Sequence, residues 1–88
     1  MIFKMRISLN TFEFAKYYHN IIAFCAIIEY GSFSGAAQRL GISQPAISKQ
    51  VSDLEDFIGH KLILRNNRVL NLSPKGQLVF NKFKNKSN

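Results

Sequence analysis

A mainly α-helical fold with a small β-wing is predicted for this chain of 88 residues by three observations. Two short amphipathic segments meet at Gly41, so a pair of helices is expected to cross at a tight turn. Two apolar runs, 62–65 and 68–72, flank Asn66-Asn67, a pair that suits a hairpin turn because Asn tolerates positive φ. A Ser-Pro step then opens a further apolar segment, which predicts a last helix.

The first helix of the pair is short. Ser34 can cap it, while Ala36, Ala37 and Leu40 supply its small apolar face. Gly41 can take the left-handed conformation that ends a helix, and Ile42 is expected to follow it as an apolar plug.

The second helix has one apolar stripe and one polar face. Ser43 is its expected N-cap, and Pro45 falls in its first turn, where the missing N–H costs little. Apolar residues recur at helical spacing, and the residues off that stripe are polar. The stripe is formed by Ile47, Val51, Leu54 and Ile58, and the polar face by Gln44, Ser48, Lys49 and Ser52. These features favour a helix-turn-helix that reads DNA over a helical corner in an ordinary domain.

The charge of the chain supports a polyanionic partner. The net charge is +7 with a pI near 9.9, and residues 31–88 hold nine basic residues against three acidic ones. The half that contains the helix pair is therefore the basic half, which favours nucleic acid over a generally basic, solubilising surface.

The segment from Tyr18 to Phe83 resembles the DNA-binding domain of LysR-type transcriptional regulators. The resemblance rests on ordered motifs: Ala36-Ala37, Leu40, Ser43-Gln44-Pro45-Ala46, Ser48, Leu54-Glu55 and Ser73-Pro74-Lys75-Gly76. It implies a winged helix-turn-helix with the start of a linker helix, in a cytoplasmic, nucleoid-associated bacterial regulator that binds double-stranded DNA as a dimer.

The expected DNA contacts follow from this fold. Gln44, Pro45, Ser48 and Lys49 would face the major groove, with Ser52 at its far side. Phosphate contacts are expected from the helix starts and from the wing, namely from Ser34, Ser43, Arg65 and Arg68. The alternatives are pure N-capping for the two serines and solvated surface positions for the two arginines.

A dimer interface is expected along the first and last helices. The helix near 17–30 has a core stripe of Ile21, Phe24, Cys25 and Ile28, and Ile22 and Ile27 make it apolar beyond that stripe. In the family that the chain resembles, the first helix and the linker helix build the dimer. The expected interface residues are Ile22, Ile27, Val79, Phe80 and Phe83, and Leu78 is a further apolar position of the last helix.

The chain divides into three expected parts: an extension at 1–16 whose alternation fits a strand, the domain at 17–73, and a truncated linker helix with a basic tail at 74–88. Neither an effector-binding domain nor catalytic, metal or cofactor residues are expected on it. An alternative function is a truncated partner that forms heterodimers with a full-length regulator and titrates it, and a third is a decayed fragment. Cys25 is expected to be a buried, inert thiol, with redox sensing as the alternative.

Overall fold

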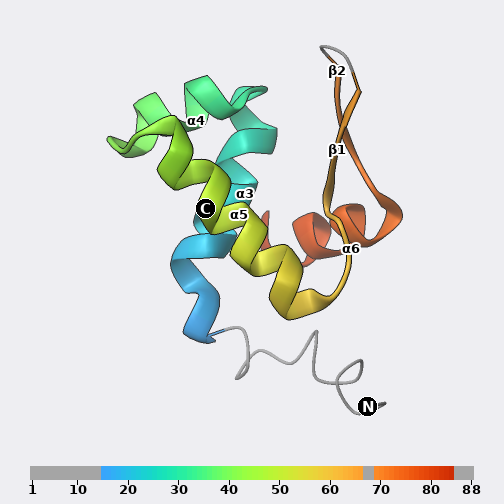
Figure 1. The fold of residues 1–88 in the computed structure, drawn as a ribbon. Helices are drawn as coiled ribbons and strands as arrows, with labels where there is room; N and C mark the ends of the chain where they lie inside the picture. The colour runs from blue at the N-terminus through green and yellow to red at the C-terminus, as the bar shows by residue number, and fades with distance from the viewer. Residues whose placement is uncertain (1–14, 67–68, 85–88) are drawn as a thin grey trace.

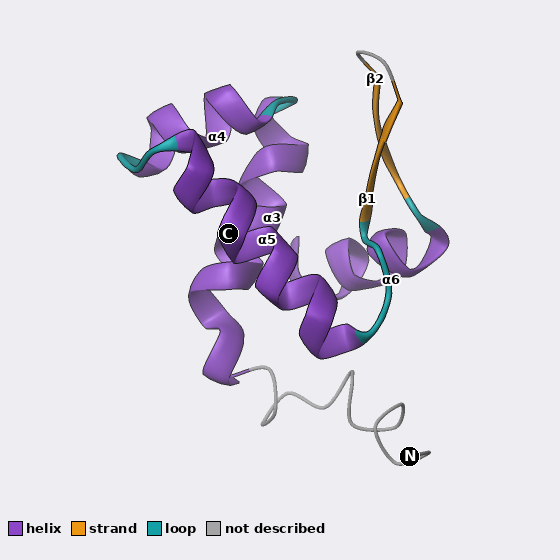
Figure 2. Ribbon diagram, viewed as in Figure 1, coloured by secondary structure: helices purple, strands orange, loops and turns teal. Residues whose placement is uncertain are grey.

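The computed structural model describes residues 15–66 and 69–84 and has the predicted fold class, four α-helices and a two-stranded antiparallel sheet (Figures 1 and 2). Its elements in order are η1 (Ala15–Tyr17), α3 (Tyr18–Tyr30), α4 (Phe33–Leu40), α5 (Gln44–Ile58), β1 (Ile63–Asn66), β2 (Val69–Leu72) and α6 (Pro74–Phe83). The expected strand at 1–10 lies outside the described residues.

The core lies where α3 packs against α4, α5 and α6. The apolar stripe predicted for the second helix of the pair is confirmed, because Ile47, Val51, Leu54 and Ile58 are all buried. Burial of this one stripe fixes the rotation of α5 and turns its polar face to solvent. Two further contacts hold α5 on α3: Tyr17 stacks on Phe57 with ring centroids 4.2 Å apart, and Asn20 Nδ2 donates to the Gln50 carbonyl at 2.8 Å.

The turn of the helix pair has the expected left-handed glycine. Gly41 has φ 72° and closes α4, and Gly59 has φ 85° and closes α5. The prediction for Ile42 was wrong: its side chain is 36% exposed. Its N–H already binds the carbonyl of Ala37 at 3.0 Å, so the backbone completes the helix end and no apolar plug is required.

The expected cap of α4 also needs correction. Ser32, not Ser34, is the N-cap, because Ser32 has an extended backbone (φ −166°, ψ 158°) and its Oγ accepts from Gly35 N at 2.8 Å. Ser34 lies inside the first turn of α4 and is exposed. Two serines two residues apart offer the same local signal, and the backbone geometry decides between them.

Two residues of the expected dimer interface lie in the core of the single chain. Ile27 and Val79 are both 0% exposed, so neither has surface left for a partner. The reason is that α3 is covered on more than one side, by α4, α5 and α6, and therefore buries more than one stripe. Leu78, by contrast, is 56% exposed on α6.

The wing hairpin is shifted from its expected turn. Asn66 pairs with Val69, and Arg65 pairs with Leu70, so Asn66 belongs to β1. Either Asn can stand in a two-residue turn, so the Asn-Asn signal left the register open. Arg68 lies outside the described residues.

Cys25 is buried in the core. Burial, with a smaller contribution from the negative charge of Glu29, raises the pKa of its thiol to about 11. The thiol is therefore protonated near neutral pH, and because the reactive species is the thiolate, the geometry favours the inert role over redox sensing.

Candidate nucleic-acid interface

The candidate interface begins at the N-terminus of α5. Ser43 caps this helix by accepting from Ala46 N at 3.2 Å, which confirms the expected cap. Gln44 and Pro45 form the first turn and are exposed. The N-terminus of α5 therefore reaches solvent with polar groups and with the positive end of the helix dipole.

The predicted polar face stands on the solvent side of α5. Lys49 and Ser52 are exposed and Ser48 is half-buried, while the opposite stripe of the helix is in the core. The structure thus brings together Gln44, Pro45, Ser48, Lys49 and Ser52 on one helix, with Ser43 at its start. Ser34 lies apart from them, on the first turn of α4.

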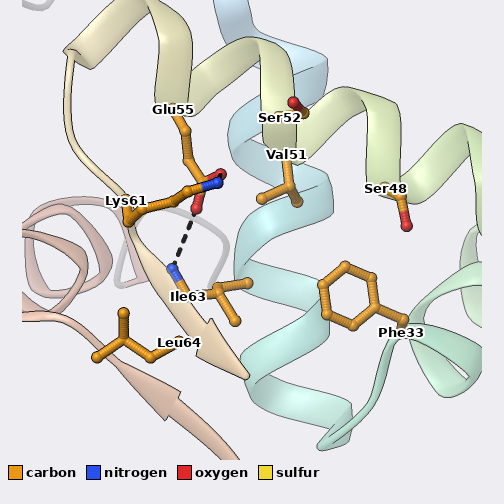
Figure 3. Close-up of a pocket in the computed structure, with 8 residues that line it drawn as sticks. All are labelled: Phe33, Ser48, Val51, Ser52, Glu55, Lys61, Ile63 and Leu64. Atoms are coloured by element: carbon orange, nitrogen blue, oxygen red, sulfur yellow. Dashed lines mark hydrogen bonds and ion pairs between the residues drawn. The ribbon is translucent and has the colours of Figure 1, made fainter. Parts of the chain in front are cut away.

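A groove runs between α5 and β1 (Figure 3). Its volume is about 440 Å³, and its lining combines polar or charged side chains with apolar ones. The lining residues are Phe33, Ser48, Val51, Ser52, Glu55, Lys61, Ile63 and Leu64. The predicted base-reading face and the base of the wing therefore share one concave surface.

Glu55 ties the end of α5 to the base of the wing. Its Oε2 accepts from Leu62 N at 2.8 Å and from Ile63 N at 3.2 Å, and Figure 3 shows the second bond as a dashed line. Its Oε1 lies 3.6 Å from Lys61 Nζ, and only 10% of the Glu55 side chain is exposed. This carboxylate sets where β1 starts relative to α5.

Ser73 ties the base of the wing to α6. Its Oγ donates to the Lys61 carbonyl at 2.5 Å and accepts from Gly76 N at 2.9 Å, while its N–H donates to the Leu62 carbonyl at 3.0 Å. Both backbone polar groups of Leu62 are thus bound, its N–H by Glu55 and its carbonyl by Ser73. The sequence indicated Ser73 only as part of the Ser-Pro step that opens the last helix and of one motif, and Glu55 only as part of another motif.

The structure describes only one of the two arginines that were expected on the wing. Arg65 lies on β1 opposite Leu70. Arg68 falls in the connection that the structure does not describe, so the pairing of two arginines about the wing tip stays a prediction.

Among residues 15–66 and 69–84, no three His, Cys, Asp or Glu side chains gather as a metal ion would require. Within the same ranges, no helix has the length and apolar character of a membrane span.

A helix pair with a capped, polar second helix, followed by a β-hairpin, defines a winged helix-turn-helix domain. The sequence profile described as "Bacterial regulatory helix-turn-helix protein, lysR family" matches residues 18–77. The chain therefore belongs to the lysR family of bacterial regulatory helix-turn-helix proteins.

Individual relatives agree with this assignment. The HTH-type transcriptional regulator TdcA of Escherichia coli (strain K12) is 38% identical over 74 residues, which are 84% of this chain and 23% of TdcA. The chain thus spans about a quarter of the length of that relative.

Solved structures give the same fold. The crystal structure of the BenM DNA-binding domain with catB site 1 DNA has a TM-score of 0.73 and 34% identity, and the match covers 80% of each chain. The complex of the CbnR DNA-binding domain with DNA has a TM-score of 0.72 and 30% identity, covering 78% of this chain and 79% of that one. The fold is that of LysR DNA-binding domains.

Proposed function

We propose that this chain binds duplex DNA as the DNA-binding domain of a LysR-type transcription regulator. One observation carries the proposal: α5 buries a complete apolar stripe and turns its capped N-terminus and its polar face to solvent. The two similar domains solved with DNA support the same role. On this basis the DNA-binding unit is 17–73, with α6 as the start of a linker helix, acting in the cytoplasm on the bacterial chromosome.

The side chains of α5 suit the major groove. Gln44 can bind adenine through N6 and N7, Lys49 can donate to guanine O6 and N7, and the ring of Pro45 can contact a thymine methyl group. Ser48 and Ser52 can donate or accept. Base discrimination is therefore assigned to α5.

Phosphate contacts are assigned to the flanks of that helix. Ser34 and Ser43 lie at or beside the starts of α4 and α5, where helix N-termini favour anions. The groove between α5 and β1 is open, and the polar part of its lining includes Ser48, Ser52 and Lys61. These three side chains are assigned to one strand of the sugar-phosphate backbone. The arginines of the wing, Arg65 and Arg68, would then reach the next groove.

The proposal predicts a strong dependence of DNA affinity on salt. About six neutralised phosphates per chain give a log–log slope near −5, so affinity for a duplex should fall about a thousandfold between 50 and 200 mM salt. Fluorescence anisotropy of a labelled duplex over that range measures the slope. Affinity that is insensitive to salt, or absent at 50 mM, would contradict the proposal.

We also propose that the chain forms a dimer through α3 and α6. The surface assigned to it excludes the buried Ile27 and Val79 and retains Ile22, Phe80 and Phe83, which are half-buried. Leu78 is added because it is 56% exposed on α6. Single apolar side chains at a surface are ordinary, so the assignment needs a direct test.

Two leucines provide a matched pair for that test. Leu78→Lys should convert a dimer to a monomer in sedimentation velocity, because it puts a charge into the proposed apolar contact. Leu64→Lys, at a leucine that is 44% exposed on β1, should leave the dimer unchanged. A sedimentation coefficient that does not respond to Leu78→Lys would remove α6 from the interface.

A further inference from the structure

The charge of α5 is opposite to that of the chain. The chain carries a net charge of +7, yet α5 has one basic residue, Lys49, against three acidic ones, Asp53, Glu55 and Asp56. Acidic side chains on a helix that approaches DNA weaken its attraction to phosphates. Glu55 is accounted for by its bonds to the base of the wing, which leaves the two aspartates to be explained.

Asp53 lies one helical turn after Lys49 and pairs with it. Lys49 Nζ is 3.2 Å from Asp53 Oδ2 and 3.4 Å from Oδ1, so both carboxylate oxygens share the ammonium group. The side chains are 75% and 45% exposed. An exposed pair of this kind contributes little to fold stability, so its consequences are expected in binding.

We propose that Asp53 determines specificity by holding Lys49 for a base contact and withholding it from phosphates, an inference that rests on the proposed function. Affinity for unselected DNA comes from cations that neutralise phosphates. The negative charge of the Asp53 carboxylate offsets the attraction of the Lys49 ammonium group for phosphates, and the carboxylate itself repels them. DNA that lacks the target sequence is therefore bound less tightly, because the Asp53 carboxylate on α5 repels its phosphates.

A DNA site with the target sequence offsets the repulsion between Asp53 and the phosphates. The ammonium group of Lys49 has three donors, so it can stay bound to Asp53 while it donates to guanine O6 or N7. The carboxylate of Asp53 keeps free lone pairs that can accept from cytosine N4. Together the two side chains match the major-groove edge of a G·C pair, whereas a phosphate offers Asp53 no donor.

The test compares two aspartates on the same helix. Asp53→Asn removes the partner of Lys49, and Asp56→Asn removes the same unit of charge three residues further on, at an exposed position. Each variant is titrated by anisotropy against an unselected duplex and against a duplex selected with the wild-type chain, over a range of salt. Thermal unfolding of each variant should match that of the wild type.

Asp53→Asn should bind the unselected duplex about threefold to tenfold more tightly, with a salt slope steeper by about one, because one more cation meets phosphate. Its preference for the selected duplex should fall by about the same factor or more. Asp56→Asn should change both quantities less. In a Lys49→Met background, Asp53→Asn should lose most of its effect on the unselected duplex.

Three results would overturn the inference. If Asp53→Asn and Asp56→Asn change DNA affinity equally, Asp53 acts only through the net charge of the chain. An unchanged preference in Asp53→Asn, with a wild-type chain that does select a duplex, would refute the inference and leave the proposed function standing. A wild-type chain that selects no duplex would refute both.

Discussion

Gly76→Ala is expected to destabilise the fold by about 2–3 kcal/mol and to lower the unfolding midpoint by at least about 8 °C. An added Cβ at this position would overlap the carbonyl oxygen of Leu62 and lie 2.9 Å from its carbonyl carbon. Alanine favours a helix over glycine by about 1 kcal/mol, so the overlap must exceed that gain.

The backbone of Leu62 cannot easily move aside. Its N–H is bound to Glu55 Oε2 at 2.8 Å and its carbonyl to Ser73 N at 3.0 Å. The loss should therefore appear as global destabilisation, measured by thermal unfolding followed by circular dichroism.

Gln77→Ala is the matched control, because it changes the next residue of α6 at an exposed position and loses one exposed hydrogen bond, to Asn81. It should stay within about 0.5 kcal/mol of the wild type. A Gly76→Ala protein as stable as Gln77→Ala would mean that α6 does not approach the base of the wing as closely as described.

Glu55→Ala is expected to cost about 2 kcal/mol and to loosen the wing. It leaves the N–H groups of Leu62 and Ile63 without their acceptor in a partly buried position, and such donors cost about 1–3 kcal/mol each when they stay unsatisfied. The groove is open, so water can replace part of what is lost. Thermal unfolding gives the total, and hydrogen exchange at the two amides shows whether the loss is local.

Glu55→Gln separates the acceptor from the charge. Glutamine keeps a side-chain oxygen for the two N–H groups and should cost less than half as much as alanine. Lys61→Met tests the ion pair alone, and because the Lys61 side chain is 77% exposed, it should stay within about 0.5 kcal/mol of the wild type. Glutamine as harmful as alanine would show that the charge, rather than the hydrogen bonds, holds the wing.

Local signals predicted the helix pair well. The stripe of Ile47, Val51, Leu54 and Ile58 and the terminating Gly41 depend on residues a few positions apart, and the structure has them as expected. One error, the cap of α4, arose because two neighbours, Ser32 and Ser34, carried the same signal. Only the backbone conformation distinguishes such neighbours.

Long-range contacts could not be predicted. Ile27 was predicted to lie at the dimer interface because nothing in the sequence shows how many sides of α3 are covered. The junction of Glu55, Leu62 and Ser73 joins residues 7 to 18 positions apart, a spacing with no periodicity to reveal it. The expected DNA contacts on α5 could be predicted to lie together, because they are on one helix and its periodicity places them on one face.

Selection of duplexes from a random DNA library tests the central claim most directly. At physiological salt the wild-type chain should enrich an inverted repeat whose half-sites lie one helical turn, or a multiple of it, apart. In a parallel selection, Gln44→Ala should lose about 1–3 kcal/mol of discrimination at one base pair of each half-site. Recovery of unselected sequence by both proteins would contradict base reading by α5.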